Sequence, residues 1–428
     1  MFKMYTYTKE IPLRYTVDIF IAGGGPAGLT AGITAARQGK KVFIAELAGF
    51  FGGGATAQLV PVFMQFTDGA GTFLAGGIGR EIHDLNGGSA INSEAIKVIY
   101  DNLVRDSGAD FSFFTNVLDV VCDTDGHIDH VICNGKSGIF AVKAGVYLDC
   151  TGDGDLSAMA GADYEFGDDN GSVMGTTLCS SWNYIDWARV QRPDDKLLQK
   201  AFDDGVFKDL DLHLPGMFKI NDKHGGGNIG HCFNVDATDE RSLTAAMVEG
   251  RRKLTEYSRY YKEYLTGYED MYMTATAPYL GVRESRRIMG DYIMTKQDFI
   301  DRASFDDEIG RYSYPVDIHE SKPGKEANAE FESDFKTLRY KSGESYGIPY
   351  RALTPKGFSN VLVAGRCMST DRAMQSSIRV MPGCFITGQA IGMAAALAAD
   401  AGNDVRGFDV GTLQDKLVEA GGYLPNRR

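Results

Sequence analysis

One stretch near the start of the sequence constrains its fold more than any other. Residues 17–22 form a short apolar run of strand length, and Gly23, Gly25 and Gly28 follow where a helical pattern begins. In this G-x-G-x-x-G spacing the first glycine permits a tight turn, the second lets backbone approach a pyrophosphate, and the third lets the helix pack closely on the strand. Backbone N–H groups at the helix start then face the phosphates. The stretch therefore predicts a dinucleotide-binding turn.

The residues after this turn continue the same pattern. Gly39 is placed to cap the helix, a second strand follows over 41–45, and Glu46 comes next. An acid roughly twenty residues after the glycines accepts a hydrogen bond from a ribose hydroxyl. Strand, glycines, helix, cap, strand and acid in one register are stronger evidence than a lone G-x-G-x-x-G.

Composition limits the partners and the compartment. The chain of 428 residues carries a formal net charge of −13, which argues against nucleic-acid or anionic-membrane partners and favours a small-molecule substrate. Its seven cysteines are scattered and none has C-x-x-C spacing, which disfavours iron–sulfur clusters and a disulfide framework. No signal-like segment is expected at the N-terminus, nor any apolar stretch long enough to span a bilayer. These features together favour a reducing cytoplasm.

The order of elements predicts an α/β protein with two units. Residues 1–158 and 341–428 are expected to form a discontinuous, Rossmann-like nucleotide-binding domain, and residues 159–340 an inserted α+β substrate or cap domain. Within the first unit we expect a helix over 92–106, a hairpin over 110–133, and a strand over 144–149. The inserted unit should contain an amphipathic helix with Thr238 as its N-cap, and Lys322 to Gly347 should form a solvated crossover. A strand over 360–365 and a helix over 384–400, rich in small residues, should complete the first unit.

Several motifs in this order resemble those of one enzyme family. They are Gly-Gly-Gly-Pro-Ala-Gly at 23–28, Gly-Gly-Ala-Thr at 53–56, Asp-Cys-Thr-Gly-Asp-Gly-Asp at 149–155, Gly-Val-Arg-Glu-Ser-Arg-Arg at 281–287, Asn-Val-Leu-Val-Ala-Gly-Arg at 360–366 and Arg-Val-Met-Pro-Gly at 379–383. With them the chain resembles the FAD-dependent oxidoreductases built on the glutathione-reductase type of FAD fold. Within these it is similar to a bacterial branch related to the succinate dehydrogenase and fumarate reductase flavoproteins.

The resemblance implies a set of FAD contacts. The glycine turn would hold the pyrophosphate, Glu46 the ribose, and the backbone at Val117 the adenine, while a helix start at 381–384 would face the flavin N1 and O2 edge. Arg366 stands where many relatives carry aspartate, next to the glycine beside the ribityl chain. The glycine-rich loop has no histidine for covalent attachment, so a dissociable, non-covalent FAD is expected. The implied cofactor-binding residues are Gly23, Gly25, Pro26, Ala27, Gly28, Glu46, Gly53, Gly54, Ala55, Thr56, Val117, Thr151, Gly152, Gly365, Arg366, Met381 and Gly383.

Two clusters are candidates for chemistry on the substrate. Arg283 and Arg286 belong to a dense charged run whose guanidinium forks suit a carboxylate or an enolate-like oxygen, although an ion-pair network between the two units would use the same residues. His231 ends a glycine-rich run and is a candidate general acid or base, the alternative being a surface loop. That run repeats G-x-G-x-x-G at 225–230, but no apolar strand precedes it, so a second nucleotide site is not expected.

Two further groups of residues are expected to have structural roles and no role in the chemistry. Cys122, His127, His130 and Cys133 lie on either side of a hairpin turn, and strand alternation would send His130 and Cys133 to opposite faces, so no metal site is expected. The tyrosines at 257, 261, 264 and 268 have helical spacing and are expected to pack in a core or a subunit contact, the alternative being an aromatic substrate wall.

The reaction follows from the resemblance and the cofactor. We expect hydride transfer between the flavin N5 atom and a small organic substrate, as a dehydrogenase or a C=C reductase. NAD(P)H is a candidate transient electron donor. A flavin monooxygenase or oxidase is the alternative within enzymes. An electron-transfer or accessory flavoprotein without its own substrate is the alternative outside them, and a tRNA-modifying flavoprotein is disfavoured by the acidic charge. A homodimer is the expected assembly.

Overall fold

The computed structural model describes residues 4–123, 126–212 and 216–427. Its largest sheet has the strand order β3-β2-β1-β6-β5-β4, and β15 also pairs with β6. β3, β2, β1, β6 and β15 run parallel, whereas β4, β5 and β6 form an antiparallel meander. This arrangement confirms the predicted α/β class with a Rossmann-like sheet. The strands are β1 (Leu13–Ala22), β2 (Val42–Ala45), β3 (Asp110–Ser112), β4 (Asn116–Cys122), β5 (Ile128–Gly135), β6 (Gly138–Asp149) and β15 (Val361–Val363).

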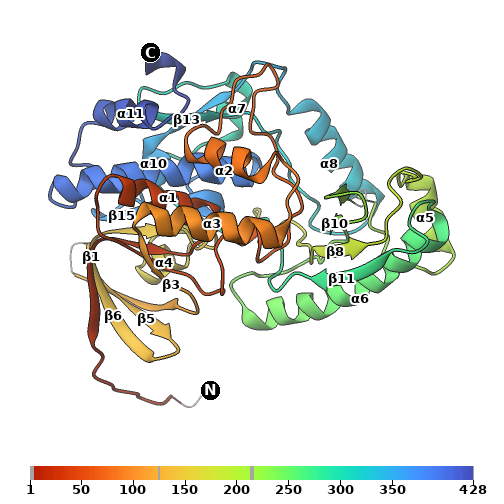
Figure 1. The fold of residues 1–428 in the computed structure, drawn as a ribbon, viewed down its shortest axis with the longest axis horizontal. Helices are drawn as coiled ribbons and strands as arrows, with labels where there is room; N and C mark the ends of the chain where they lie inside the picture. Colours follow the sequence, from red (N-terminus) through yellow and green to blue (C-terminus); the bar gives the residue numbers. More distant parts are fainter. Residues whose placement is uncertain (1–3, 124–125, 213–215, 428) are drawn as a thin grey trace.

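Small residues let two helices lie very close together beside this sheet (Figure 1). They are α1 (Pro26–Arg37) and α10 (Met381–Asp400). A Cβ on Gly388 would lie 2.2 Å from the carbonyl oxygen of Ala27, and one on Gly392 would lie 2.4 Å from that of Ala31. Close-packed interiors leave no room for such an atom. The small-residue pattern thus brings segments more than 350 residues apart in the sequence into direct contact.

Other helices cover the first core or connect its strands. The expected helix over 92–106 is α3, and its N-cap Asn92 accepts hydrogen bonds from two backbone N–H groups. These helices are α2 (Ile78–Asn86), α3 (Ser93–Ser107), α4 (Asp155–Met159), α7 (Lys296–Asp301), α9 (Arg372–Ile378) and α11 (Val410–Glu419).

A second hydrophobic core lies to one side of the first and runs from Leu178 to Leu280. It contains an antiparallel sheet of order β11-β8-β10-β9, with the long helix α6 beside it (Figure 1). Residues 288–316 pack in the first core instead. The second core therefore covers a shorter segment than the predicted inserted domain 159–340. Its elements are β8 (Ser180–Asn183), α5 (Asp195–Asp203), β9 (Gly216–Lys219), β10 (Gly225–Asn228), α6 (Glu240–Tyr264) and β11 (Tyr272–Thr276).

Two short antiparallel pairs complete the sheets. One joins β7 (Tyr164–Phe166) to β12 (Arg286–Ile288), and the other joins β13 (Glu308–Tyr312) to β14 (Tyr346–Pro349). The buried residues of β13 and β14 belong to the first core.

The amphipathic helix α6 begins one residue later than the prediction. Asp239, not Thr238, is its N-cap, because the Asp239 carboxylate accepts hydrogen bonds from the backbone N–H groups of Arg241 and Ser242. The Thr238 hydroxyl instead bonds to Asp236. Tyr257, Tyr261 and Tyr264 of this helix pack into or against the second core, as expected. Tyr268 also packs there, but it lies beyond the end of the helix.

Three other segments test the sequence expectations. Residues 225–228 form strand β10 and not a nucleotide-binding turn, as expected. The segment 322–347, expected to be a solvated crossover, contains the helix α8 (Lys325–Thr337). Contrary to the expectation of no sufficiently long apolar stretch, α10 has 20 residues and a mean hydropathy of 1.3, enough to cross a membrane by length and composition alone. Because 94% of that stretch is buried inside the protein, it is a core helix here.

Candidate active site

The glycine turn between β1 and α1 leaves an open space where a ligand could approach the backbone. Gly23 has a φ of +90°, and a Cβ there would lie 2.6 Å from the carbonyl oxygen of Cys150. A Cβ on Gly28 would lie 1.8 Å from the carbonyl oxygen of Gly23. By contrast, a Cβ on Gly25 would meet no atom within 4 Å. The first and third glycines are therefore required by packing, whereas the second faces free space, as a pyrophosphate cradle requires.

Glu46 braces this turn from the end of β2. Its carboxylate accepts hydrogen bonds from the backbone N–H groups of Gly24, at 2.6 Å, and Ala48, at 2.7 Å. Burial raises the pKa of this carboxyl, and the backbone hydrogen bonds oppose the rise. Its predicted role, accepting a hydrogen bond from a ribose hydroxyl, stays a prediction.

A cavity of about 540 Å³ begins at the glycine turn and extends between the two cores. Many residues assigned to FAD on the sequence line its first part, and they come from five separate segments. The tertiary structure therefore brings the scattered motifs of the first core to one place. The lining residues among the predicted cofactor contacts are Gly25, Pro26, Ala27, Gly53, Gly54, Thr151, Gly152, Gly365, Arg366 and Met381.

The other predicted contacts are not among the lining residues of this cavity. Val117 lies on β4, and the Thr56 hydroxyl donates to the carbonyl of Phe51. A Cβ on Gly383 would lie 2.4 Å from the carbonyl oxygen of Ile378, so this glycine serves packing at the start of α10. The predicted contacts that do not line the cavity are Gly23, Gly28, Glu46, Ala55, Thr56, Val117 and Gly383.

Arg366 lies on the cavity wall and is held by an ion pair. Its guanidinium donates to the Asp153 carboxylate at 2.6 Å and to the Ser285 hydroxyl at 2.9 Å. This contact explains how a cation is tolerated where relatives commonly carry aspartate, because the opposite charge is supplied by a neighbouring residue.

Arg283 lines the far part of the cavity and is 7% exposed. Its guanidinium donates to neutral oxygens, namely the carbonyl of Gly175 at 2.8 Å, the hydroxyl of Thr177 at 2.9 Å and the amide of Asn228 at 3.1 Å. Burial, together with the neighbouring charge of Arg379, lowers the pKa of Arg283 to about 10. The group is therefore still charged at neutral pH.

Arg379 is the second cation on this wall. It donates to the Asp317 carboxylate at 3.0 Å, and its side chain is 11% exposed. Its Nε atom is buried and has no hydrogen-bond partner within the described part of the chain. A buried N–H without an acceptor is costly, and a bound anion would satisfy it. Arg283 and Arg379 thus form a cationic pocket beside the cofactor part of the cavity.

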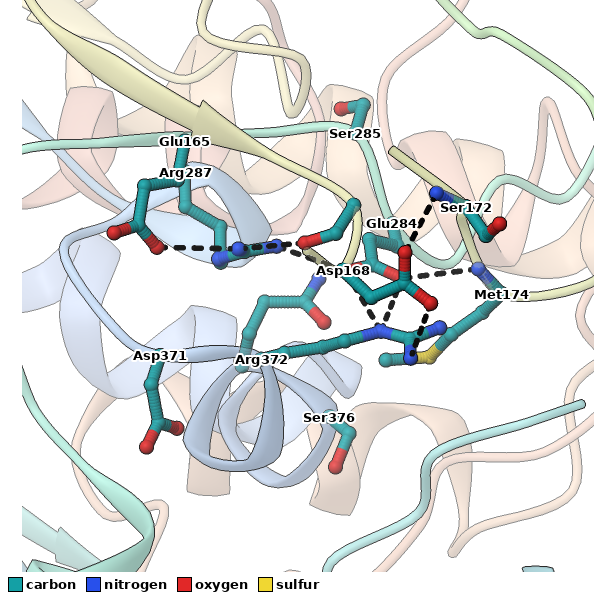
Figure 2. A network of polar contacts seen from close by, with 12 residues as sticks. Glu165, Asp168, Ser172, Met174, Glu284, Ser285, Arg287, Asp371, Arg372 and Ser376 are labelled. Atoms are coloured by element: carbon teal, nitrogen blue, oxygen red, sulfur yellow. Dashed lines mark hydrogen bonds and ion pairs between the residues drawn. The ribbon is translucent and has the colours of Figure 1, made fainter. Parts of the chain in front are cut away.

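Arg286, the other predicted catalytic arginine, lies outside the cavity lining. It forms an ion pair with Asp155 at 2.8 Å. Its neighbours Glu284 and Arg287 belong to a buried network with Arg372, which Figure 2 shows. The sequence left two roles open for the charged run at 283–287, substrate binding and an ion-pair network, and its residues divide between them. Arg283 faces the cavity, whereas the other charged residues form the ion-pair network.

The predicted acid or base His231 lies behind the cavity wall. Its Nε2 atom is 3.0 Å from Nδ1 of His319, and it is His319 that lines the cavity. His319 is 7% exposed, and Phe331 of α8 packs against it with ring centroids 5.5 Å apart. The alternative of a surface loop at His231 is wrong, because this side chain is 2% exposed.

Sequence reasoning missed several residues on the cavity wall. Arg379 stood inside a quoted motif, but its neighbours Asp317 and His319 come from a segment without a recognisable pattern. The helix α8 contributes Asn328 and Phe335, although its polar composition suggested a solvated crossover. These contacts depend on distant segments, so no local signal identifies them.

The four residues weighed as a metal site are held separately. His127 contacts Ser359 at 3.0 Å and Asn360 at 3.3 Å, and His130 contacts Asp129 at 2.7 Å. Cys133 is buried on β5.

The fold and the glycine turn at the start of this cavity fit an enzyme that binds a dinucleotide. The chain belongs to the FAD dependent oxidoreductase family, whose model matches residues 18–417. Membership makes the protein an FAD-dependent oxidoreductase, with FAD as the implied cofactor. The open glycine turn and the lining motifs fit this group. The predicted FAD-dependent oxidoreductase family, the enzyme class and FAD as the cofactor are thereby confirmed.

Two solved structures are similar to this chain at low sequence identity. The p-nitrophenol 4-monooxygenase PnpA from Pseudomonas putida DLL-E4 is 11% identical, with a TM-score of 0.51, over 95% of this chain and 85% of that chain. A geranylgeranyl bacteriochlorophyll reductase-like protein from Thermoplasma acidophilum is also 11% identical, with a TM-score of 0.49, over 95% of this chain and 83% of that chain. No curated protein matches the sequence significantly. At 11% identity the likeness to the monooxygenase shows the fold alone.

Proposed function

We propose that the protein transfers a hydride between FAD and a small organic anion, as a dehydrogenase or a C=C reductase. The observation that carries this proposal is the pair of guanidinium groups, Arg283 and Arg379, on the wall of the cavity that begins at the glycine turn. Arginine forks bind carboxylates through two parallel hydrogen bonds, and burial strengthens such contacts. A carboxylate or enolate-like oxygen is the group that fits this pocket.

The side chains of the pocket would orient the substrate. When bound, FAD supplies the hydride donor or acceptor at N5. Arg283 and Arg379 would hold the anionic group of the substrate and fix its distance from the cofactor part of the cavity. Val62 and Phe335 line the same space with apolar surface, which limits the entry of water.

Tyr314 and Asp317 would support this anion pocket. The Tyr314 hydroxyl donates to the Asp317 carboxylate at 3.3 Å, and that carboxylate holds Arg379. Burial raises the pKa of Tyr314, so its hydroxyl keeps the proton at neutral pH. The tyrosine therefore remains a hydrogen-bond donor on the cavity wall while Asp317 positions the guanidinium.

We also infer a dissociable FAD and an NAD(P)H donor. The loop 52–57 contains no histidine for covalent attachment, which supports a non-covalent cofactor in a branch related to the succinate dehydrogenase flavoproteins. NAD(P)H can reach a flavin without a second dinucleotide turn, and the one further G-x-G-x-x-G is strand β10.

Anaerobic reduction followed by stopped-flow reoxidation tests the proposal. The FAD-loaded protein is reduced with NADPH, NADH or dithionite and mixed with α,β-unsaturated carboxylates or with the matched neutral amides. We expect one carboxylate to reoxidise the flavin much faster than its amide and faster than air does. Rapid reoxidation by air with a hydroxylated product would instead establish a monooxygenase.

Two arginine variants make this test specific. Arg283→Met removes charge-assisted hydrogen bonds to the anion. Transition-state stabilisation should therefore fall by about 1.5–3 kcal/mol, so kcat/KM for the carboxylate should fall roughly 10- to 150-fold. Arg286→Met makes the same chemical change outside the cavity lining and should leave the preference for carboxylate over amide unchanged. If both variants lose this preference equally, the anion pocket is not where we place it.

A further inference from the structure

Beyond the flavin reaction, we propose that His231, His319 and Glu320 bind a divalent first-row transition-metal ion at the edge of the substrate cavity. All three side chains are buried, and one potential ligand atom from each lies within 4.8 Å of the others. His319 also lines the cavity, so the cluster adjoins the space that receives the substrate. Two imidazoles and one carboxylate are a ligand set that iron(II), cobalt(II) and zinc(II) bind in proteins.

A carboxylate lies behind each of the two imidazoles. Nδ1 of His231 lies 3.1 Å from the carboxylate of Asp211, and Nε2 of His319 lies 3.4 Å from that of Asp317. Metal-binding histidines commonly have such a carboxylate beside their second ring nitrogen, which orients the ring. Both histidines of the cluster share this feature.

The two remaining ring nitrogens face one another. Nε2 of His231 and Nδ1 of His319 are 3.0 Å apart and share a hydrogen bond. A metal ion held between them would displace the shared proton to solvent. Two nitrogens about 2.1 Å from one ion and about 90° apart lie about 3.0 Å from each other, which matches adjacent positions of an octahedron.

Carboxylates and two guanidinium groups surround the pair. Asp211 and Asp317 lie beside the two imidazoles, and Glu320 is the third member of the cluster. Arg379 pairs with Asp317, and Arg283 interacts with the charges of Asp317 and Glu320. A bound cation would complete the neutralisation of these carboxylates.

Cobalt binding to the untagged, FAD-loaded protein tests the site directly. After treatment with a chelator, the protein is titrated with Co²⁺ in the absence of oxygen, and bound metal is counted by mass spectrometry after dialysis. We expect about one Co²⁺ per chain, with ligand-field absorption at wavelengths longer than those of flavin. Wild-type protein that retains no Co²⁺ would overturn the proposal and would leave the histidine pair sharing a proton.

Variants separate the ligands from the residues behind them. Glu320→Gln and His231→Gln should abolish stoichiometric binding. Asp211→Asn leaves the three ligands in place and should weaken Co²⁺ affinity about 10- to 100-fold. His224→Gln is the matched control, because His224 bonds to Ser181 away from the cluster, and it should bind like wild type. Unchanged binding in Glu320→Gln and His231→Gln would place the metal elsewhere and overturn the proposal.

Discussion

Glu46 shows how burial and a few backbone N–H groups set the chemistry of a single side chain. Desolvation raises the pKa of its carboxyl above the usual 4.5, and hydrogen bonds from Ala48, Gly24 and Leu47 lower it. The carboxylate therefore accepts hydrogen bonds from backbone N–H groups at the glycine turn, although its buried surroundings disfavour the charged form. Its protonation should depend on whether the cofactor is present.

This conflict predicts a pH dependence of FAD binding. A ribose hydroxyl donating to Glu46 favours the ionised form, so the pKa is lower with FAD bound than without it. FAD affinity should then be full above the raised pKa of the FAD-free protein and fall as the pH drops through that value. Fluorescence titrations of FAD across pH 4 to 8 measure the effect. Glu46→Gln should bind FAD more weakly with a flatter pH profile, and an equally steep profile in this variant would contradict the role.

At the level of elements, the contact between α1 and α10 depends on glycine. A methyl group on Gly392 would lie 2.4 Å from the Ala31 carbonyl oxygen, so Gly392→Ala forces the helices apart. We expect this variant to lose about 1–3 kcal/mol of unfolding free energy, measured by urea denaturation. It should also bind FAD more weakly, because α10 begins at the cavity.

Gly411 provides the matched control for this substitution. It lies in the first turn of α11, and the atoms nearest to a Cβ there would be the ends of the exposed Arg427 side chain and of Asp409, the N-cap of the same helix, with no backbone of another helix among them. Gly411→Ala should therefore be neutral or stabilise by up to about 1 kcal/mol, because alanine has the higher helix propensity. Equal destabilisation of both variants would show that close packing of α1 and α10 is not the cause.

The network around Glu284 connects elements near the junction of the two cores (Figure 2). Its carboxylate is fully buried and accepts hydrogen bonds from Arg287 at 2.8 Å, from Arg372 at 3.0 Å and from the backbone N–H of Met174 at 2.9 Å. Arg372 begins α9, whereas Met174 precedes β8. One carboxylate therefore holds together segments that are far apart in the sequence.

Removing this charge should be strongly destabilising. Glu284→Gln leaves two guanidinium groups without their shared partner, and we expect a loss of about 3–5 kcal/mol in urea denaturation. Glu165→Gln is the control, because Glu165 also pairs with Arg287 but its side chain is 53% exposed. Exposed pairs contribute about 0–1 kcal/mol. A comparable loss in both variants would contradict the special role of the buried carboxylate.

For the whole molecule, the two hydrophobic cores provide separate optical signals. Both tryptophans, Trp182 and Trp187, belong to the second core or pack against it. The predicted FAD contacts that line the cavity come from the first core.

FAD at 100 times its Kd should stabilise the first core by about 2.7 kcal/mol. We expect FAD to shift the urea transition seen by circular dichroism and to leave that of tryptophan fluorescence nearly in place. Equal shifts would show that the cores unfold as one unit.

The nucleotide-binding half of the protein could be predicted from the sequence because its signals are local. Strand, glycine turn, helix and acid follow one another within residues 17–46, and each glycine has a steric reason that the structure confirms at Gly23 and Gly28. The motifs at 151–152 and 365–366 line the same cavity for the same reason, since each ends a strand of one parallel sheet. Local pattern and sheet topology are enough to bring these segments together.

The substrate half could not be predicted in the same way. Arg283 and Arg286 look equivalent in the sequence, yet one lines the cavity and the other pairs with Asp155. His231 was singled out, but His319 reaches the cavity, and the two meet across 88 residues. Helix α8, with the polar composition of a surface crossover, supplies Phe335 to the wall. The direction of each side chain depends on packing between distant segments, which a local pattern does not encode.

The sequence alone therefore determined the α/β class, the FAD family and the position of the glycine turn, because these follow from short-range periodicity and backbone sterics. The tertiary structure decided which charged residues meet beside the cofactor. It joined Arg283 to Arg379 and His231 to His319 through contacts between segments that are far apart in the chain. Burial then lowered the pKa of Arg283, since desolvation depends on the surrounding fold and not on neighbouring residues in the sequence.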